Sequence, residues 1–155
     1  MQIVMGYLIG EKNFGQVSIT VWKAVGIATL ITGLITTTLY FNSDIVFRIF
    51  TDNEEILKLG QQIFFIEIFL EIGRAVNIVM VRALQAAGDI KTPVTVGIGG
   101  MWFIAVFGAY TLGIVLNFGL VGVWIAMALD EIIRALIFIY RWQSGRWQQK
   151  ILINL

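Results

Sequence analysis

The strongest constraint on this chain is a long stretch without charge. Residues 92 to 129 contain no Asp, Glu, Lys or Arg, and most are aliphatic, aromatic or small. A soluble domain has no use for such a run, whereas a helix that crosses a membrane needs about 20 consecutive apolar residues. The whole chain agrees, because 58% of its residues are hydrophobic and 14% are charged. We therefore expect an all-α, polytopic membrane helix bundle.

Four segments are apolar and long enough to be membrane-spanning helices. We expect these spans at about 21–41, 55–87, 93–115 and 120–140, in a single membrane domain that covers residues 1–155. Residues 1–10 are too short to span and are typical of the end of a preceding membrane helix. The small-residue pairs Ala109/Gly113 and Gly122/Ala126 allow close approach between neighbouring helices.

Polar residues predict where these helices end. Residues 42–44, Asn-Ser-Asp, are expected to break the first helix. Thr51 and Glu54 have the spacing of a capping box at the start of the second helix. Thr92 is expected to cap the third helix, with Pro93 in the first turn, where proline is tolerated.

The distribution of Lys and Arg outside the spans predicts the orientation in the membrane. Arg48 and Lys58 are the basic residues on one side, and the remaining basic residues outside the spans share the other side: Lys12, Lys23, Arg82, Lys91, Arg141, Arg146 and Lys150. Cytoplasmic segments carry the excess of positive charge. We therefore expect a multi-pass protein of the plasma (inner) membrane with both termini cytoplasmic, including the basic tail 141–155.

Composition also excludes several function classes. The chain has no cysteine and no histidine, so disulfides, thiolate nucleophiles and the commonest metal ligand are absent. Its net charge is +1 and no basic patch stands out, so nucleic acid is not an expected partner. No nucleophile elbow or phosphate-binding glycine loop is present. We expect neither an enzyme nor a bound cofactor.

The second span carries charged residues in its middle. Glu67, Glu71 and Arg74 fall on one helix face, at a depth where each charge costs about 2.5–3.5 kcal/mol or more. One consistent arrangement pairs Glu71 with Arg74 and leaves Glu67 free to take up a proton or a cation. The alternative is a structural ion-pair network between helices. We favour the functional interpretation because such residues often mark ion pathways.

The last span carries a second charged group. Arg134 follows Asp130 by four residues and Glu131 by three, so the arginine can pair with either acid. This spacing favours a structural or supporting role, with Asn77 on the second span as a further polar group. Together the two helices hold four acidic and two basic residues, which leaves two carboxylates without a partner.

The first span is rich in threonine. Its threonines are Thr29, Thr32, Thr36, Thr37 and Thr38. Their hydroxyl groups can bond to carbonyl oxygens of their own helix or face helix partners. We expect this packing role rather than the lining of a pore.

Four stretches, in the correct order, resemble the C-terminal part of multidrug and toxic compound extrusion (MATE) transporters. They are QIVMGYLIGEKNFGQV (2–17), IFTDNEEI (49–56), RALQAAGDIKTPV (82–94) and LNFGLVGVWIAMALDEIIRALIFIYRWQSGRW (116–147). The resemblance covers essentially the whole chain.

This resemblance implies a twelve-helix antiporter with two six-helix lobes. Such a protein exchanges H⁺ or Na⁺ for organic cations by alternating access, a form of multidrug and xenobiotic export. The chain would supply the last four helices and the end of the one before, as a fragment that needs the N-terminal lobe of the same transporter. In this family, carboxylates of the second lobe bind the coupling cation, and Glu67 and Glu71 are the positions here that could hold that role, with Na⁺ or H⁺ as the cation; which of the two aligns stays open.

Three other interpretations remain. The chain could belong to a lipid-linked oligosaccharide flippase of the related superfamily. It could be a self-contained four-helix transporter that works as a dimer in the lipid bilayer. It could also be a membrane scaffold without transport, in which all six charges are structural.

Overall fold

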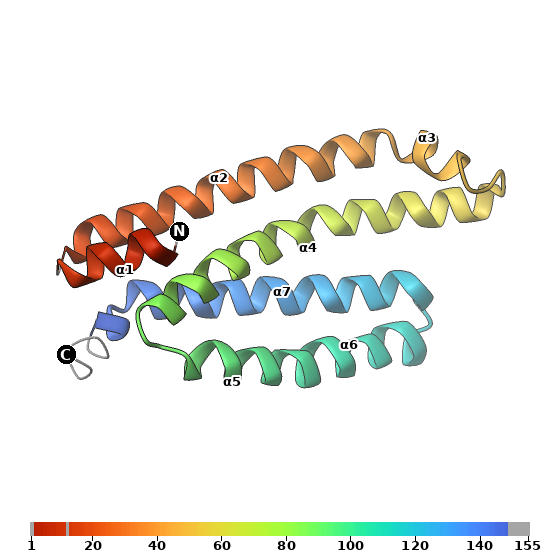
Figure 1. The fold of residues 1–155 in the computed structure, drawn as a ribbon. Helices are drawn as coiled ribbons and strands as arrows, with labels where there is room; N and C mark the ends of the chain where they lie inside the picture. Colours follow the sequence, from red (N-terminus) through yellow and green to blue (C-terminus); the bar gives the residue numbers. More distant parts are fainter. Residues whose placement is uncertain (1, 12, 149–155) are drawn as a thin grey trace.

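The chain is a bundle of long helices. The computed structural model describes residues 2–11 and 13–148, and within these it contains helices and no strand (Figure 1). The elements are α1 (Gln2–Gly10), α2 (Phe14–Phe41), α3 (Ser43–Arg48), α4 (Glu54–Ala86), α5 (Lys91–Gly100), η1 (Met101–Val106), α6 (Phe107–Ala109), η2 (Tyr110–Val115) and α7 (Gly119–Gln143). The expected all-α membrane bundle is confirmed.

Helix α4 is the central element of the bundle. It packs against α2 on one side and α7 on the other, and α7 also contacts the rod formed by α5, η1, α6 and η2. Figure 1 shows α1, the start of α2, the α4–α5 turn and the end of α7 at one end of the bundle. Helix α3 and the turn into α7 lie at the opposite end. The charged face of α4 is therefore enclosed by helices on both sides.

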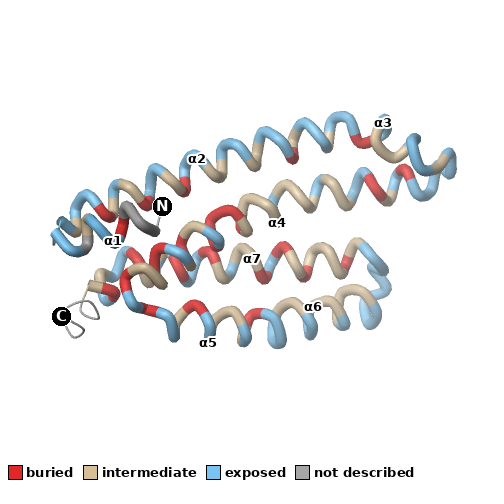
Figure 2. Tube along the Cα trace, in the orientation of Figure 1, coloured by how far each residue is buried: buried red, intermediate tan, exposed pale blue. Residues whose placement is uncertain are grey.

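Within the described part of the chain, two helices are long and apolar enough to cross a membrane by length and composition. They are Phe14–Phe41 and the continuous helical rod Lys91–Val115. Both expose large apolar side chains, including Leu30 at 65% and Phe103 at 82%. Figure 2 shows exposed residues along both helices. Helices α4 and α7 have similar lengths but contain the charged residues. Apolar side chains on this outer surface are suited to contact with lipid.

The described helix ends correct two expectations about capping residues. The helix start after residue 50 is capped by Asn53, whose side chain accepts from the backbone N–H of Glu55, so the capping box of Thr51 is wrong. The Thr51 hydroxyl instead accepts from the backbone N–H of Asn53. Thr92 is not a cap either, because α5 begins one residue earlier and the Thr92 hydroxyl donates to Asp89.

The first long helix also differs from its expected bounds. It begins at Phe14, where the Asn13 side chain caps it, so the helix extends beyond the expected apolar span. It ends at Phe41 as expected, but Ser43 and Asp44 belong to the next helix, α3, rather than to a break. A helix can continue outside the hydrocarbon core because polar side chains there contact water. Hydropathy predicts the part of a helix that lies in the hydrocarbon core and not the full length of the helix.

The glycines of α5–η2 and α7 allow these helices to approach closely. A Cβ atom on Gly122 would lie 2.6 Å from the backbone carbon of Leu112. One on Gly108 would lie 3.1 Å from the Cβ atom of Ala126, and one on Gly113 would lie 3.1 Å from a methyl group of Val123. The small residues of the third and fourth spans therefore form a helix–helix contact, as their spacing predicted.

Most of the buried core lies at the end of the bundle that contains the α4–α5 turn. Trp142 and Trp147 stack with ring centroids 4.3 Å apart, and the Trp147 indole N–H donates to the carbonyl oxygen of Trp142. Val17, Leu84 and other apolar residues of α1, α2, α4 and α7 complete this cluster. The expected tail is thus partly packed onto the bundle; residues 149–155 lie outside the described part, as do Lys12 and Lys150.

Candidate functional site

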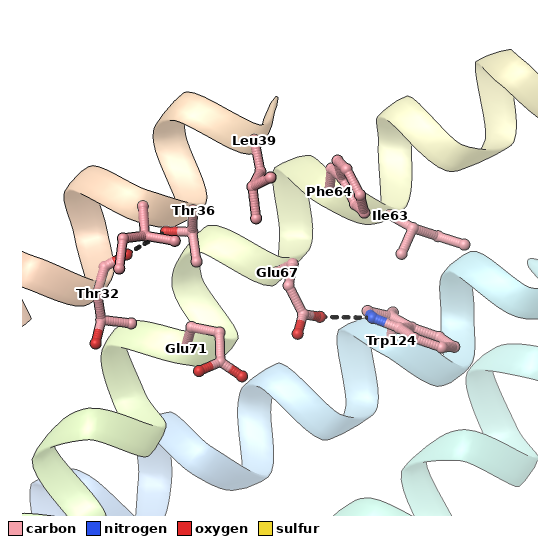
Figure 3. A pocket seen from close by; sticks show the side chains of 9 residues that line it. Thr32, Thr36, Leu39, Ile63, Phe64, Glu67, Glu71 and Trp124 are labelled. Carbon is pink, nitrogen blue, oxygen red and sulfur yellow. Dashed lines mark hydrogen bonds between the residues drawn. The ribbon is translucent and has the colours of Figure 1, made fainter. Parts of the chain in front are cut away.

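A cavity lies between α2, α4 and α7. Its volume is about 520 Å³. It is lined by Thr32, Ile35, Thr36, Leu39, Ile63, Phe64, Glu67, Glu71 and Trp124. Figure 3 shows the carboxyl groups of Glu67 and Glu71 pointing into this space, one helical turn apart on α4. Both predicted coupling residues therefore share one mainly apolar cavity.

Glu67 is held from the neighbouring helix. The indole N–H of Trp124 on α7 donates to Oε2 of Glu67 over 2.7 Å (Figure 3). The salt bridges of the described residues do not include Glu67. Trp124 was not among the predicted site residues, since a tryptophan in an apolar span carries no sequence signal for this role beyond its single N–H donor.

Glu71 has a charged partner instead. Arg74, three residues further along α4, forms a salt bridge and hydrogen bond with Glu71. This pair is the one that the spacing predicted. Glu67 and Glu71 therefore differ in their surroundings: the first has a neutral donor and the second has an arginine.

Threonines of α2 form the opposite wall of the cavity. Thr32 and Thr36 line it. The Thr36 hydroxyl donates to the carbonyl oxygen of Thr32 over 2.9 Å. Thr29 and Thr38 likewise donate to carbonyl oxygens of their own helix, as expected. Their hydroxyls are thereby satisfied without a partner helix.

The second charged group surrounds Arg134. Its Nη2 atom lies 2.7 Å from Oδ2 of Asp130 and 2.8 Å from Oε1 of Glu131. Arg134 thus forms salt bridges with both acids, whereas the spacing predicted that it could pair with either one.

The two charged groups form one network across α4 and α7. Nε of Arg74 lies 3.8 Å from Oε1 of Glu131, which is also the partner of Arg134. Nδ2 of Asn77 donates to Oε2 of Glu131 over 2.6 Å and to its backbone oxygen over 2.8 Å. The five residues Glu71, Arg74, Glu131, Arg134 and Asp130 are called the α4–α7 network below. An ion-pair network between helices was the alternative interpretation of these charges, and the contacts of Glu131 with Arg74 and Asn77 form such a network.

A third ion pair lies at the end of the bundle that contains the α4–α5 turn. Asp89 is fully buried, and Nε of Arg141 lies 2.8 Å from its Oδ2 atom. The Thr92 hydroxyl donates to the same carboxylate over 2.8 Å. The sequence indicated Arg141 only as a basic residue of the tail, whereas the fold pairs it with the turn between α4 and α5.

The predicted Na⁺ site can be compared with the available ligands. Two carboxyl groups and the threonine side chains of α2 contribute oxygen atoms to the cavity wall. Among residues 2–11 and 13–148, no group of three or more His, Cys, Asp or Glu side chains is placed to hold a metal ion. Coordination by Glu67 and Glu71 remains a prediction.

Fold and cavity define the class: an all-helical membrane protein whose polar residues gather between its helices. The family model described as MatE matches residues 1–111, and the chain belongs to the MatE family. It is similar to the "Uncharacterized transporter YisQ" of Bacillus subtilis (strain 168), with 36% identity over 153 residues. That alignment covers 96% of this chain and 33% of the relative, so the chain spans about a third of the relative's length. No solved structure matches the chain significantly.

Proposed function

We propose that this chain forms part of the second lobe of a cation-coupled multidrug efflux antiporter. The transporter exchanges H⁺ or Na⁺ for organic cations by alternating access. Membership in the MatE family supports transport rather than catalysis. The match over a third of a transporter relative supports a larger protein in which the N-terminal lobe completes the pathway.

The observation that carries this proposal is the pair of carboxyl groups in one cavity. Glu67 and Glu71 both face the space between α2, α4 and α7, but only Glu71 has a salt bridge among the described residues. A carboxylate in an apolar cavity without a countercharge gains strongly from binding a proton or a cation. Glu67 is therefore our choice for the coupling residue, with Glu71 as its neighbour in the same site.

The network beside the cavity has a supporting role in this proposal. Arg74 holds Glu71, while Glu131 and Asn77 connect α4 to α7. These contacts limit rotation of α4 about its axis and keep both glutamates directed into the cavity. Positioning of this kind is what a transporter needs at a site that must bind and release an ion.

The proposed placement is in the inner membrane with both termini cytoplasmic. The end of the bundle with the α4–α5 turn carries Arg82, Lys91 and Arg141, and the end with α3 carries four acids against two bases. Positive charge is enriched on cytoplasmic segments, which supports this orientation.

The test is export of a fluorescent organic cation by the full-length protein that contains this chain. We expect Glu67→Gln to abolish cation-driven export and Glu71→Gln to reduce it at least tenfold, with the protein still present in the membrane. Glu55→Gln is the matched control, because Glu55 is exposed in the first turn of the same helix. Unchanged export in both variants would contradict the proposal.

Two of the alternatives predict different results in the same preparation. A flippase would move lipid-linked oligosaccharides and leave the dye gradient unchanged. A scaffold would show no transport, and paired neutralisation of its charges would be harmless. Organic-cation export that needs Glu67 separates the proposed antiporter from both.

A further inference from the structure

Asp130 is the most deeply buried acid of the α4–α7 network. Its side chain is 6% exposed and faces Gly100, the last residue of α5. A Cβ atom on Gly100 would lie 2.4 Å from Oδ1 of Asp130 and 3.0 Å from Cδ of Arg134. An alanine at position 100 would therefore require the Asp130 carboxyl group to shift. The cavity lining does not include Asp130, so its position is separate from that of Glu67.

The acids of the network receive different numbers of hydrogen-bond donors. Glu131 accepts from Arg134 on one oxygen and from Asn77 on the other. Asp130 has Arg134 beside Oδ2, but its Oδ1 atom is buried and has no hydrogen-bond partner within residues 2–11 and 13–148. Donors stabilise an ionised carboxylate, and a buried oxygen without one is costly. Of the three acids of the network, Asp130 is the one with a buried carboxylate oxygen that lacks a hydrogen-bond donor among the described residues.

The charges of the network do not balance. Its three acids, Glu71, Glu131 and Asp130, face two bases, Arg74 and Arg134. The segment of α5 that faces Asp130, residues 92–100, contains no ionisable side chain. One bound proton makes the network neutral. Neutrality is strongly favoured in a low-dielectric site, because an excess charge there has little solvation.

We propose that Asp130 is a proton-binding site of this protein, distinct from the cavity glutamates. The proton resides on Oδ1, and Oδ2 continues to accept from Arg134. When one carboxyl oxygen lacks a hydrogen-bond partner, burial of the neutral acid in this position costs less free energy than burial of the ionised form. No covalent bond other than the O–H bond forms or breaks.

This site deepens the proposed function, because the network connects it to the cavity. Arg74 is shared between Glu71 and Glu131, and Arg134 between Glu131 and Asp130. When a cation neutralises Glu71, Arg74 forms its salt bridge with Glu131 only. Arg134 can then form its salt bridge with Asp130 only. The ionised form of Asp130 is then stabilised and its proton is released. By linkage, loss of the proton from Asp130 strengthens cation binding at Glu71 by the same factor.

Infrared spectroscopy of the purified full-length protein at neutral pH tests this site without any transport measurement. A protonated carboxyl group gives its own C=O band, and ¹³C in the carboxyl group of aspartate moves the band of an aspartic acid. We expect a band that moves with labelled aspartate and not with labelled glutamate. We expect Asp130→Asn to lose that band entirely. Asp44→Asn is the matched control and keeps it, because Asp44 lies in an exposed ion pair with Arg48.

The outcomes separate this inference from the proposed function. The absence of any band that moves with labelled aspartate, or an aspartate band that survives in Asp130→Asn, overturns the proton on Asp130. The labelled, unmutated protein decides the residue type even where Asp130→Asn does not fold. Glu67→Gln keeps the band, since Glu67 lies outside the network. Dye export unaffected by Glu67→Gln and Glu71→Gln would end the antiporter proposal while the aspartate band still stands.

Discussion

The indole N–H of Trp124 donates to the carboxylate of Glu67, from a position 57 residues further along the chain. This hydrogen bond joins α7 to α4 across the cavity and gives Glu67 a neutral donor where Glu71 has an arginine. A donor stabilises the ionised carboxylate without neutralising it. The bond therefore keeps Glu67 ready to accept a cation, and its removal has a predictable consequence.

Trp124→Phe removes the donor but keeps an aromatic ring. A hydrogen bond to a charged group contributes about 1.5–3 kcal/mol, so we expect the coupling cation to bind roughly tenfold more tightly or more, because the free carboxylate is less stabilised. The measurement is the concentration of H⁺ or Na⁺ that gives half-maximal dye export by the full-length protein. Trp102→Phe serves as control, since Trp102 is 59% exposed on η1. Equal half-maximal concentrations in the Trp124 variant and the wild type would show that this bond does not act on the coupling ion.

Arg74 distinguishes a structural from a coupling role for Glu71. Arg74→Gln leaves Glu71 without its salt bridge, so we expect less folded protein in the membrane. The double variant Glu71→Gln/Arg74→Gln removes both charges and should recover folded protein without recovering export. Fluorescence size-exclusion chromatography gives the first quantity and dye export the second. Export at the wild-type rate in the double variant would mean that the pair is only structural.

Gly122→Ala tests the close contact between α7 and η2. The added Cβ atom would lie 2.6 Å from the Leu112 carbonyl carbon and 2.7 Å from its oxygen, both backbone atoms. Overpacking of this kind costs about 1–3 kcal/mol, and we expect a lower thermal midpoint in detergent. Gly97→Ala is the control, because an added Cβ atom there has no neighbour within 4 Å. An unchanged midpoint for Gly122→Ala would indicate that the two helices are further apart.

Asp89→Ala tests the buried ion pair at the α4–α5 turn. Removal of one partner leaves Arg141 without a countercharge, and breaking a buried pair costs about 3–5 kcal/mol. Asp44→Ala removes a pair whose two side chains are 46% and 63% exposed, and pairs in contact with solvent contribute little to stability. We expect a large decrease in thermal stability for the first variant and little change for the second. Similar stability of the two variants would contradict a structural role for Asp89.

The chain by itself determined the features that depend on neighbouring residues. The charge-free run at 92–129 and the hydropathy of the other spans predicted an all-α membrane bundle, because only helices and closed barrels satisfy every backbone group in lipid. The spacing of three residues between Glu71 and Arg74 predicted their salt bridge, because such positions are neighbours on any helix. Both results follow from local geometry, which does not depend on how the helices pack.

Tertiary structure alone decided which helix faces meet. Contacts between α4 and α7 bring Trp124 to Glu67 and Arg74 to Glu131, and the turn after α4 brings Asp89 to Arg141. These pairs depend on the rotation of each helix about its axis, which is set by close contacts such as that of Gly73 with the backbone of Glu131. A hydropathy pattern specifies an apolar helix but not that rotation, since nearly every face of such a helix is apolar.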